Sequence, residues 1–455
     1  MTRTAGGWIL WLFLIVEMTI HYHTRFVPGT LHSWVLVAGC LVTLPGLLRQ
    51  YGSRPSQLPR DYRIVALIAV CVAAGYVING AAADALTFQA YVLSLASYVF
   101  VREQGSRLPL SQFYSLNAWF LVVNSLLMLA QFQTGHFYPA RLLAAGDPPL
   151  LLPSGFADGP TKNGILHGCA LAIVFARVVA LRVPLASIDG AALLLGAFAL
   201  LLTTSRAAVA GFLAAALLCT AVVLVWRRGA GAVMLRPRLT AAVLTAAVFL
   251  TVFAGERYVV VTRRPAAAAA ADGTAAAAPV NARQYASSVV VFKFISKARL
   301  SAMMSDDSIA TRFATMGTAA YVLARNPWHA VIGTGLGTFS TLFARFGSTL
   351  PHTGDIDFQD TSAHNSYLEF LVEAGLIAFV LLLALVVHVG RAAFRRPDWY
   401  NALPLVAMVA VSMGAMMFHD VLRGRIFWVP LGLLAAFAYS ERSTASEVPA
   451  AKVAG

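Results

Sequence analysis

The chain has 455 residues, of which 59% are hydrophobic and only 12% are charged, and its mean hydropathy is +0.72. Soluble domains contain roughly 45–50% apolar and about 25% charged residues, so this composition excludes an ordinary soluble protein. The net charge is +14, but many of the basic residues lie in short loops and no nucleic-acid-binding motif is present, so nucleic acid is not an expected partner. We therefore predict an all-α, polytopic membrane protein that forms one large membrane unit.

A membrane-spanning helix needs about 20 mostly apolar residues. About twelve segments of the chain have this character. They are 7–24, 31–48, 64–84, 87–102, 113–131, 163–181, 185–203, 207–226, 239–255, 367–390, 402–419 and 426–440. The first segment has a short basic start but lacks a clear small-residue cleavage site, so we predict an uncleaved helix there.

Basic residues concentrate in alternate loops, which is the pattern of cytoplasmic loops in membrane proteins. They are Arg49, Arg54, Arg60 and Arg63, then Arg102 and Arg107, then Arg182, then Arg227, Arg228, Arg236 and Arg238, and finally Arg391, Arg395 and Arg396. The opposite short loops are almost free of Lys and Arg. We therefore predict a multi-pass protein of the bacterial inner membrane with both termini, including the tail 441–455, in the cytoplasm.

Two long loops are expected on the opposite, periplasmic side. Residues 132–162 are rich in Pro and Gly, and residues 256–366 form a larger, partly helical loop between the membrane parts 1–255 and 367–440. In the larger loop, helical periodicity is visible in SSVVVFKFISKARL and in SIATRFATMGTAAYVLARNP, whose Asn-Pro ending predicts a helix stop. GTGLGTF lacks the Lys-Ser/Thr of a phosphate-binding loop, so we interpret it as a turn.

Two residues stand out as candidates for chemistry. Arg206 lies at the junction of the seventh and eighth spans, where an arginine either faces a water-filled cavity or anionic partner, or extends to the headgroups. His364 lies where the tenth span begins. A neutral imidazole there can act as a general base toward a sugar hydroxyl, and a hydrogen-bonding interfacial histidine is the alternative.

Several other polar residues are secondary candidates. Asn365 can cap the tenth span or orient a ligand. The guanidinium of Arg312 suits a diphosphate, although a solvated helix face explains it equally well. Arg423 and Arg425 break the charge pattern in a short outside loop, and Glu17, Glu369 and Glu373 lie in or near spans, where they either pair internally or bind a cation. No metal-binding signature is present, so we expect no metal or other cofactor.

Three segments, in this order, resemble the O-antigen ligase and polymerase family of bacterial membrane glycosyltransferases. They are TTSR (203–206), TRFATMGTAAYVLARNPWHAVIGTGLGTF (311–339) and HNSYLEFLVEAGL (364–376). The most specific element is the pattern of His364, Asn365, Leu368, Leu371 and Gly375. SGFADGPTKNGILHG (154–168) also resembles the family segment before the sixth span, in which Lys162-Asn163 is typical of polymerase-like members. The resemblance is strongest over about residues 190–390.

The resemblance implies a metal-independent, inverting transfer of a glycan from undecaprenyl diphosphate to an acceptor sugar hydroxyl. His364 would be the base, and Arg206 and Arg312 would bind the diphosphate. Asn365, Lys162, Arg423, Arg425 and Glu373 would support them. The acceptor would be lipid A–core in a ligase, or another lipid-linked repeat unit in an O-antigen or exopolysaccharide polymerase.

Other functions remain as alternatives. Transfer of the glycan to a protein is a third variant of the same chemistry. A lipid-linked sugar transporter is less favoured, because no half-to-half repeat is visible and such a protein needs no hundred-residue loop. A purely structural assembly protein would leave Arg206 and His364 unexplained.

Overall fold

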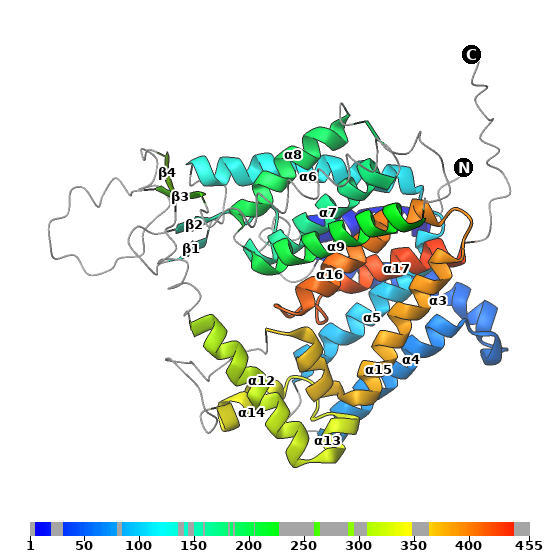
Figure 1. Ribbon diagram of the computed structural model, residues 1–455. Coiled ribbons are helices and arrows are strands. Elements are labelled where there is room, and N and C mark those ends of the chain that lie inside the picture. The colour runs from blue at the N-terminus through cyan, green and yellow to red at the C-terminus, as the bar shows by residue number, and fades with distance from the viewer. Residues whose placement is uncertain are drawn as a thin grey trace, which may run out of the picture.

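The computed structural model describes residues 5–19, 31–79, 84–134, 141–143, 150–157, 160–180, 183–184, 187–203, 205–226, 259–263, 290–294, 307–347 and 364–440. Helices dominate these residues (Figure 1). The helices of the bundle are α1 (Ala5–Met18), α3 (Leu31–Tyr51), α4 (Arg60–Asn79), α5 (Ala85–Gly105), α6 (Leu110–Thr134), α7 (Pro160–Ala180), α8 (Ile188–Leu202), α9 (Arg206–Trp226), α15 (Ser366–Phe394), α16 (Leu403–Met416) and α17 (Arg425–Tyr439). Short 3-10 turns, η1 (Pro55–Gln57) and η7 (Trp399–Ala402), precede α4 and α16.

Eight of the described helices are long and apolar enough to cross a membrane: α3, α4, α5, α6, α7, α9, α15 and α16. The shorter helices α1, α8 and α17 are also apolar. The predicted class, a polytopic α-helical membrane protein, is confirmed. The predicted number of twelve spans is not established, because the segment 239–255 lies outside the described residues.

The described part of the large loop contains three helices and one strand pair. The helices are α12 (Asp307–Arg325), α13 (Pro327–Ile332) and α14 (Phe339–Phe346), which lie together at one end of the bundle (Figure 1). The predicted helix stop is present, since α12 ends at Arg325 and the side chain of Asn326 caps α13 by accepting from Trp328 N.

One helical prediction in this loop was wrong. Within SSVVVFKFISKARL, residues Val290–Phe294 form strand β4, which pairs antiparallel with β3 (Val259–Arg263). Its run of β-branched and aromatic residues suits a strand, and pairing with a distant segment decided the outcome. In the 132–162 loop, β1 (Arg141–Leu143) and β2 (Leu150–Leu152) form a second antiparallel pair.

Small residues allow close packing at the centre of the bundle, where α7 and α9 pack against α16. A Cβ on Gly414 of α16 would lie 2.8 Å from the Cα of Gly211 in α9, so neither position has room for a side chain. Van der Waals contact between closely approaching backbones is a main source of helix association in a bilayer. The centre of the bundle is therefore held by shape as much as by apolar burial.

The helix ends sort into two groups at opposite ends of the bundle. Contacts at one end join the end of α1 and the starts of α3 and α17, because Arg425 bonds both Glu17 and Ser33. The start of α15 meets the connection after α16, where Ser366 Oγ donates to the carbonyl of His419. We call this end the site end. The arginine-rich connections, such as those that follow α3 and α15, lie at the other end.

Helix α15, which contains the predicted tenth span 367–390, is interrupted near its start. Gly375 has φ 83° and ψ 169°, which is not helical, so a short helical segment precedes the break and a long one follows it. A break leaves carbonyls without their helical partners. Those of Val372 and Glu373 accept instead from Thr334 N and Gly335 N in the large loop.

Candidate functional site

His364 stands immediately before α15 in an unusual backbone conformation. Its φ is 46°, and among the described residues no other non-glycine residue has a positive φ. His, Asn and Asp adopt this left-handed region more readily than most residues, and such positions cluster at functional sites. Its half-buried ring stacks with that of His419, with centroids 6.3 Å apart and planes 8° apart.

Asn365 fixes the start of α15. Its side-chain Oδ1 accepts hydrogen bonds from Tyr367 N and Leu368 N, both at 3.1 Å. This is an N-cap, the first of the two roles predicted for Asn365. The cap and the left-handed residue before it together set the direction in which His364 enters the site.

The connection between α16 and α17 carries the remaining groups of the site and is firmly held. Ser366 Oγ donates to the carbonyl of His419 at 2.7 Å and accepts from Val421 N at 2.6 Å. Ser94 Oγ of α5 donates to the carbonyl of Arg423 at 3.1 Å. Helices α15 and α5 therefore fix a segment that has no regular structure of its own.

The carboxyl group of Asp420 interacts electrostatically with both His364 and Lys162. Burial raises the pKa of the Asp420 carboxyl above its ordinary value, while the charges of Arg423, His364 and Lys162 act in the opposite direction. A carboxylate close to an imidazole stabilises the imidazolium that forms when a histidine takes up a proton. Asp420 was not singled out in the sequence, although it directly follows His419 and lies three residues before Arg423.

Arg423 is the centre of a cluster of acidic side chains. Its Nη2 bonds the carboxylate of Glu369 and lies 3.2 Å from Glu373 Oε1, and its Nε lies 3.3 Å from Asp420 Oδ2. The side chains of Glu369 and Glu373 are at most 1% exposed. Burial would lower the pKa of Arg423, but Glu373, Glu369 and Asp420 together raise it. The guanidinium therefore stays charged among three carboxyl groups.

The two arginines of this connection have different partners. Arg425 Nη1 lies 2.7 Å from Glu17 Oε1 and its Nη2 lies 2.8 Å from Ser33 Oγ, so it ties α17 to α1 and α3. The internal pairing predicted for Glu17, Glu369 and Glu373 is therefore present. Of the two arginines, Arg423 joins the acidic cluster and Arg425 does not.

Lys162 and Arg206 belong to two helix starts that lie against each other. A Cβ on Gly164 of α7 would lie 2.7 Å from the Cβ of Ser205, the residue before α9. Lys162 is exposed in the first turn of α7, and Arg206 is the first residue of α9. Helix starts carry partial positive charge, so both helices and both side chains favour an anion. The conformation of the Arg206 side chain is outside what the structure describes.

A buried polar network supports the start of α7. Asn124 Nδ2 donates to Asn163 Oδ1 and to His167 Nδ1, both at 3.0 Å, and His167 Nε2 donates to the carbonyl of Gly196 at 2.9 Å. Gln131 Oε1 accepts from the amides of Ser154 and Gly155. These contacts pin residues 154–157 inside the bundle next to Lys162. The sequence pointed to Asn163 only as the residue next to Lys162. In the structure Asn163 supports the start of α7 through its contact with Asn124.

Arg312 lies near the start of α12, a helix of the large loop, and its side chain is also outside the described set. The structure thus brings together His364, Asn365, Glu373 and Arg423, with Lys162 linked through Asp420. It places Arg206 at the same end of the bundle.

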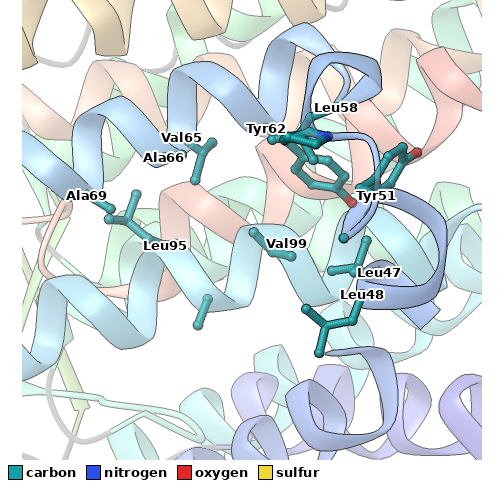
Figure 2. Close-up of a pocket in the computed structure, with 13 residues that line it drawn as sticks. Leu47, Leu48, Tyr51, Leu58, Tyr62, Val65, Ala66, Ala69, Leu95 and Val99 are labelled. Atoms are coloured by element: carbon teal, nitrogen blue, oxygen red, sulfur yellow. The ribbon is translucent and has the colours of Figure 1, made fainter. Parts of the chain in front are cut away.

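An apolar groove of about 490 Å³ lies elsewhere, between α3, α4 and α5 (Figure 2). Tyr51 and Tyr62 lie toward one end of it and Ala69 and Leu95 toward the other. It contains no histidine, carboxylate or basic side chain and lies toward the arginine-rich end. The candidate site is therefore the polar cluster at the site end.

These observations define a polytopic helical membrane protein with an imidazole, a buried guanidinium and several carboxyl groups gathered at one end of its bundle. Residues 191–383 match the family model described as O-Antigen ligase, which supports membership of that family. The match includes Arg206, Arg312, His364 and Glu373, whereas Lys162 precedes it and Arg423 follows it. It supports a ligase-type membrane glycosyltransferase role. No curated protein matches the chain.

Proposed function

We propose that this protein transfers a glycan from undecaprenyl diphosphate to a sugar hydroxyl of lipid A–core during surface polysaccharide biosynthesis. The observation that carries the proposal is the position of His364. It lies within the matched family region, has a left-handed backbone, stacks with His419, and lies within electrostatic range of the half-buried Asp420 at the site end. This is the environment that a general base requires: a fixed imidazole beside a carboxylate.

The reaction follows from these groups. A ring nitrogen of His364 accepts the proton of the acceptor hydroxyl while the hydroxyl oxygen attacks the anomeric carbon from the face opposite the diphosphate. The bond between the anomeric carbon and the diphosphate oxygen breaks, and its electron pair leaves with the diphosphate. The anomeric configuration inverts, and the Asp420 carboxylate stabilises the imidazolium that results.

The leaving diphosphate needs positive charge. We assign this role to Arg206 and Arg312, with Lys162 as support. The starts of α7 and α9 add the partial charges of their unpaired amides close to Lys162 and Arg206. Fixed positive groups that meet developing negative charge are usually the largest contribution to such catalysis, and in this proposal they require no metal ion.

The charge distribution supports a periplasmic location for the site. The arginine-rich connections gather at the end of the bundle opposite His364 and Arg423. Cytoplasmic loops of membrane proteins carry an excess of Lys and Arg. The proposed arrangement therefore has the site end in the periplasm and both termini in the cytoplasm of a bacterial inner-membrane protein.

A polymerase is the second candidate, because it would use the same donor and the same base. The segment 154–168, with Lys162 and Asn163, favours it, and its buried contacts with Asn124 and Gln131 make it an integral part of the site end. In that case the acceptor is a second lipid-linked repeat unit, of an O-antigen or an exopolysaccharide. The donor chemistry at His364 is unchanged.

Deletion of the gene, followed by gel analysis of the polysaccharides, tests the proposal. Loss of long chains from lipid A–core with accumulation of lipid-linked polymer indicates a ligase. Core that bears a single repeat indicates an O-antigen polymerase, and unchanged lipopolysaccharide with loss of secreted polymer indicates an exopolysaccharide polymerase. No change in any of these polymers would contradict the proposal.

Complementation of the deletion tests the base. His364→Ala should abolish transfer while the protein still accumulates in the membrane. His329→Ala is the matched control, because His329 belongs to α13 and has no role in the proposed reaction. Full activity of His364→Ala would remove the base assignment. Transfer by membranes treated with EDTA should persist if the reaction is metal-independent.

A further inference from the structure

The glycine-rich turn 333–339 is seated on the break in α15. Thr334 N donates to the carbonyl of Val372 at 2.8 Å, and Gly335 N donates to that of Glu373 at 3.0 Å. Thr334 Oγ1 donates to the carbonyl of Val372 as well, at 3.1 Å. The turn therefore satisfies backbone groups that the break at Gly375 would otherwise leave unpaired inside the protein.

The side chain of Glu373 links this turn to the bundle. On one side its Oε1 accepts from Phe339 N at 3.1 Å, and its carboxylate also accepts from Gly337 N. On the other side Arg423 lies 3.2 Å from the same oxygen. Arg423 in turn belongs to a segment that Ser94 and Ser366 hold. Contacts are thus continuous from the bundle, through Arg423 and Glu373, to the turn.

Helix α12 rests on the seated turn. Ala314, Ala319 and Val322 of α12 form one apolar cluster with Phe339 and Phe343 of α14 and with Val372 of α15. Helix α12 therefore packs against α14 and α15 together, and the docking of α14 contributes to its position relative to α15. Because Arg312 lies on α12 and His364 directly precedes α15, the same docking governs the spacing between those two residues.

We propose that Arg423 is a positioning residue. By holding the buried carboxylates of Glu369 and Glu373 it keeps the 333–339 turn docked on α15, and this sets the place of Arg312 relative to His364. The inference rests on the proposed function for its effect on transfer, while the docking itself is independent of that function. Loss of the guanidinium would leave buried carboxylates without their counter-charge, which is strongly destabilising locally.

The experiment measures docking directly, with Thr338→Cys as a reporter. Thr338 is 5% exposed and directly precedes Phe339, whose N–H donates to Glu373, so a cysteine there should be protected while the turn is docked. Purified protein in nanodiscs is treated with a maleimide, and the rate is corrected with the chain that lacks the reporter. The natural cysteines lie in α3, α4, α7 and α9.

With Arg423 intact, labelling should be slow. Arg423→Gln should label at least tenfold faster and lose transfer. Arg425→Gln is the matched control, because it removes an arginine of the same connection that contacts Glu17 instead of the acidic cluster, and it should keep the reporter protected. Arg423→Lys, which keeps the charge but has one donor group, should label at an intermediate rate.

A triple variant separates positioning from a direct role. In Arg423→Gln with Glu369→Gln and Glu373→Gln, neither buried carboxylate is left without a counter-charge, and the side-chain amide oxygen at position 373 can still accept from Phe339 N. Protection and part of the transfer should therefore return. Transfer that stays lost while protection returns would assign Arg423 to ligand contact and overturn the proposal.

Two other results would also overturn it. One is continued protection in Arg423→Gln, and the other is equal exposure of the reporter in Arg423→Gln and Arg425→Gln, which would indicate general loosening. Failure of the proposed function is recognised separately. In that case His364→Ala transfers normally, while Arg423→Gln still exposes the reporter.

Discussion

Gly333 and Gly375 face each other where the large loop meets α15, and both have nearly the same backbone conformation, with φ 84° and ψ 172° at Gly333 and φ 83° and ψ 169° at Gly375. A Cβ on Gly333 would lie 2.2 Å from the carbonyl oxygen of Glu373, and one on Gly375 would lie 2.4 Å from that of Val331. This region of conformational space is essentially restricted to glycine. The contact between loop and bundle therefore has two points at which no side chain fits.

Gly375→Ala should destabilise the protein by about 3 kcal/mol or more, because backbone strain of roughly 1–3 kcal/mol adds to overpacking of similar size. Thermal unfolding in detergent measures the loss. Gly390→Ala is the control in the same helix, since nothing lies within 4 Å of its added Cβ. It should be neutral or gain up to about 1 kcal/mol. Equal melting temperatures for the two variants would contradict the close contact.

Asn365→Ala should cost about 1 kcal/mol of stability, because it removes the side-chain cap of α15. Transfer should fall as well, since His364 directly precedes the cap. Asn365→Asp keeps an acceptor that caps helices well and should restore both stability and transfer. If the Asp variant is stable but inactive, the amide of Asn365 contacts a ligand.

Arg206→Lys should reduce transfer by about 10–100-fold. A lysine keeps the charge but loses the planar fork that bonds phosphate oxygens in pairs, and a hydrogen bond to a charged group contributes roughly 1.5–3 kcal/mol. Transfer rates in membranes at saturating donor measure the effect. Arg391→Lys makes the same change at an exposed position on the opposite end and should be normal. A normal rate for Arg206→Lys would mean that only positive charge is needed there.

Asp420→Asn should lower transfer and make stability less sensitive to pH. Burial raises the pKa of Asp420, so the folded protein holds this proton more tightly than the unfolded chain does. That contribution is fully present below the ordinary pKa of an aspartate and is lost as the pH rises through the folded value. The melting temperature of Asp420→Asn relative to the parent should therefore increase from pH 4 to pH 8. A constant difference over that range would contradict the raised pKa.

Local features of the sequence were enough to predict the fold class and the end of one helix. Apolar runs of membrane length predicted the helical class, and Asn326-Pro327 predicted the end of α12 at Arg325. Both signals act within one or two helical turns, so they are readable without knowing the fold. The role of Asn365 as a cap was open to sequence analysis for the same reason.

Other features depended on which distant segments meet. Residues 290–294 have a periodicity compatible with a helix, and pairing with 259–263 made them a strand. Helix α15 has the hydropathy of a continuous span, yet the turn 333–339 supplies donors that stabilise a break at Gly375. In each case a non-local hydrogen-bonding partner overrode the local preference.

By itself, therefore, the sequence determined that the protein is a helical membrane protein and which short motif contains the candidate base, because hydropathy and capping are properties of neighbouring residues. The tertiary structure alone decided that Arg423 and Arg425, two positions apart, have separate roles. Arg425 pairs with Glu17, 408 positions away, while Arg423 pairs with Glu369 and Glu373. Charges attract whichever partners folding brings close, and only the packing of the helix ends sets that choice.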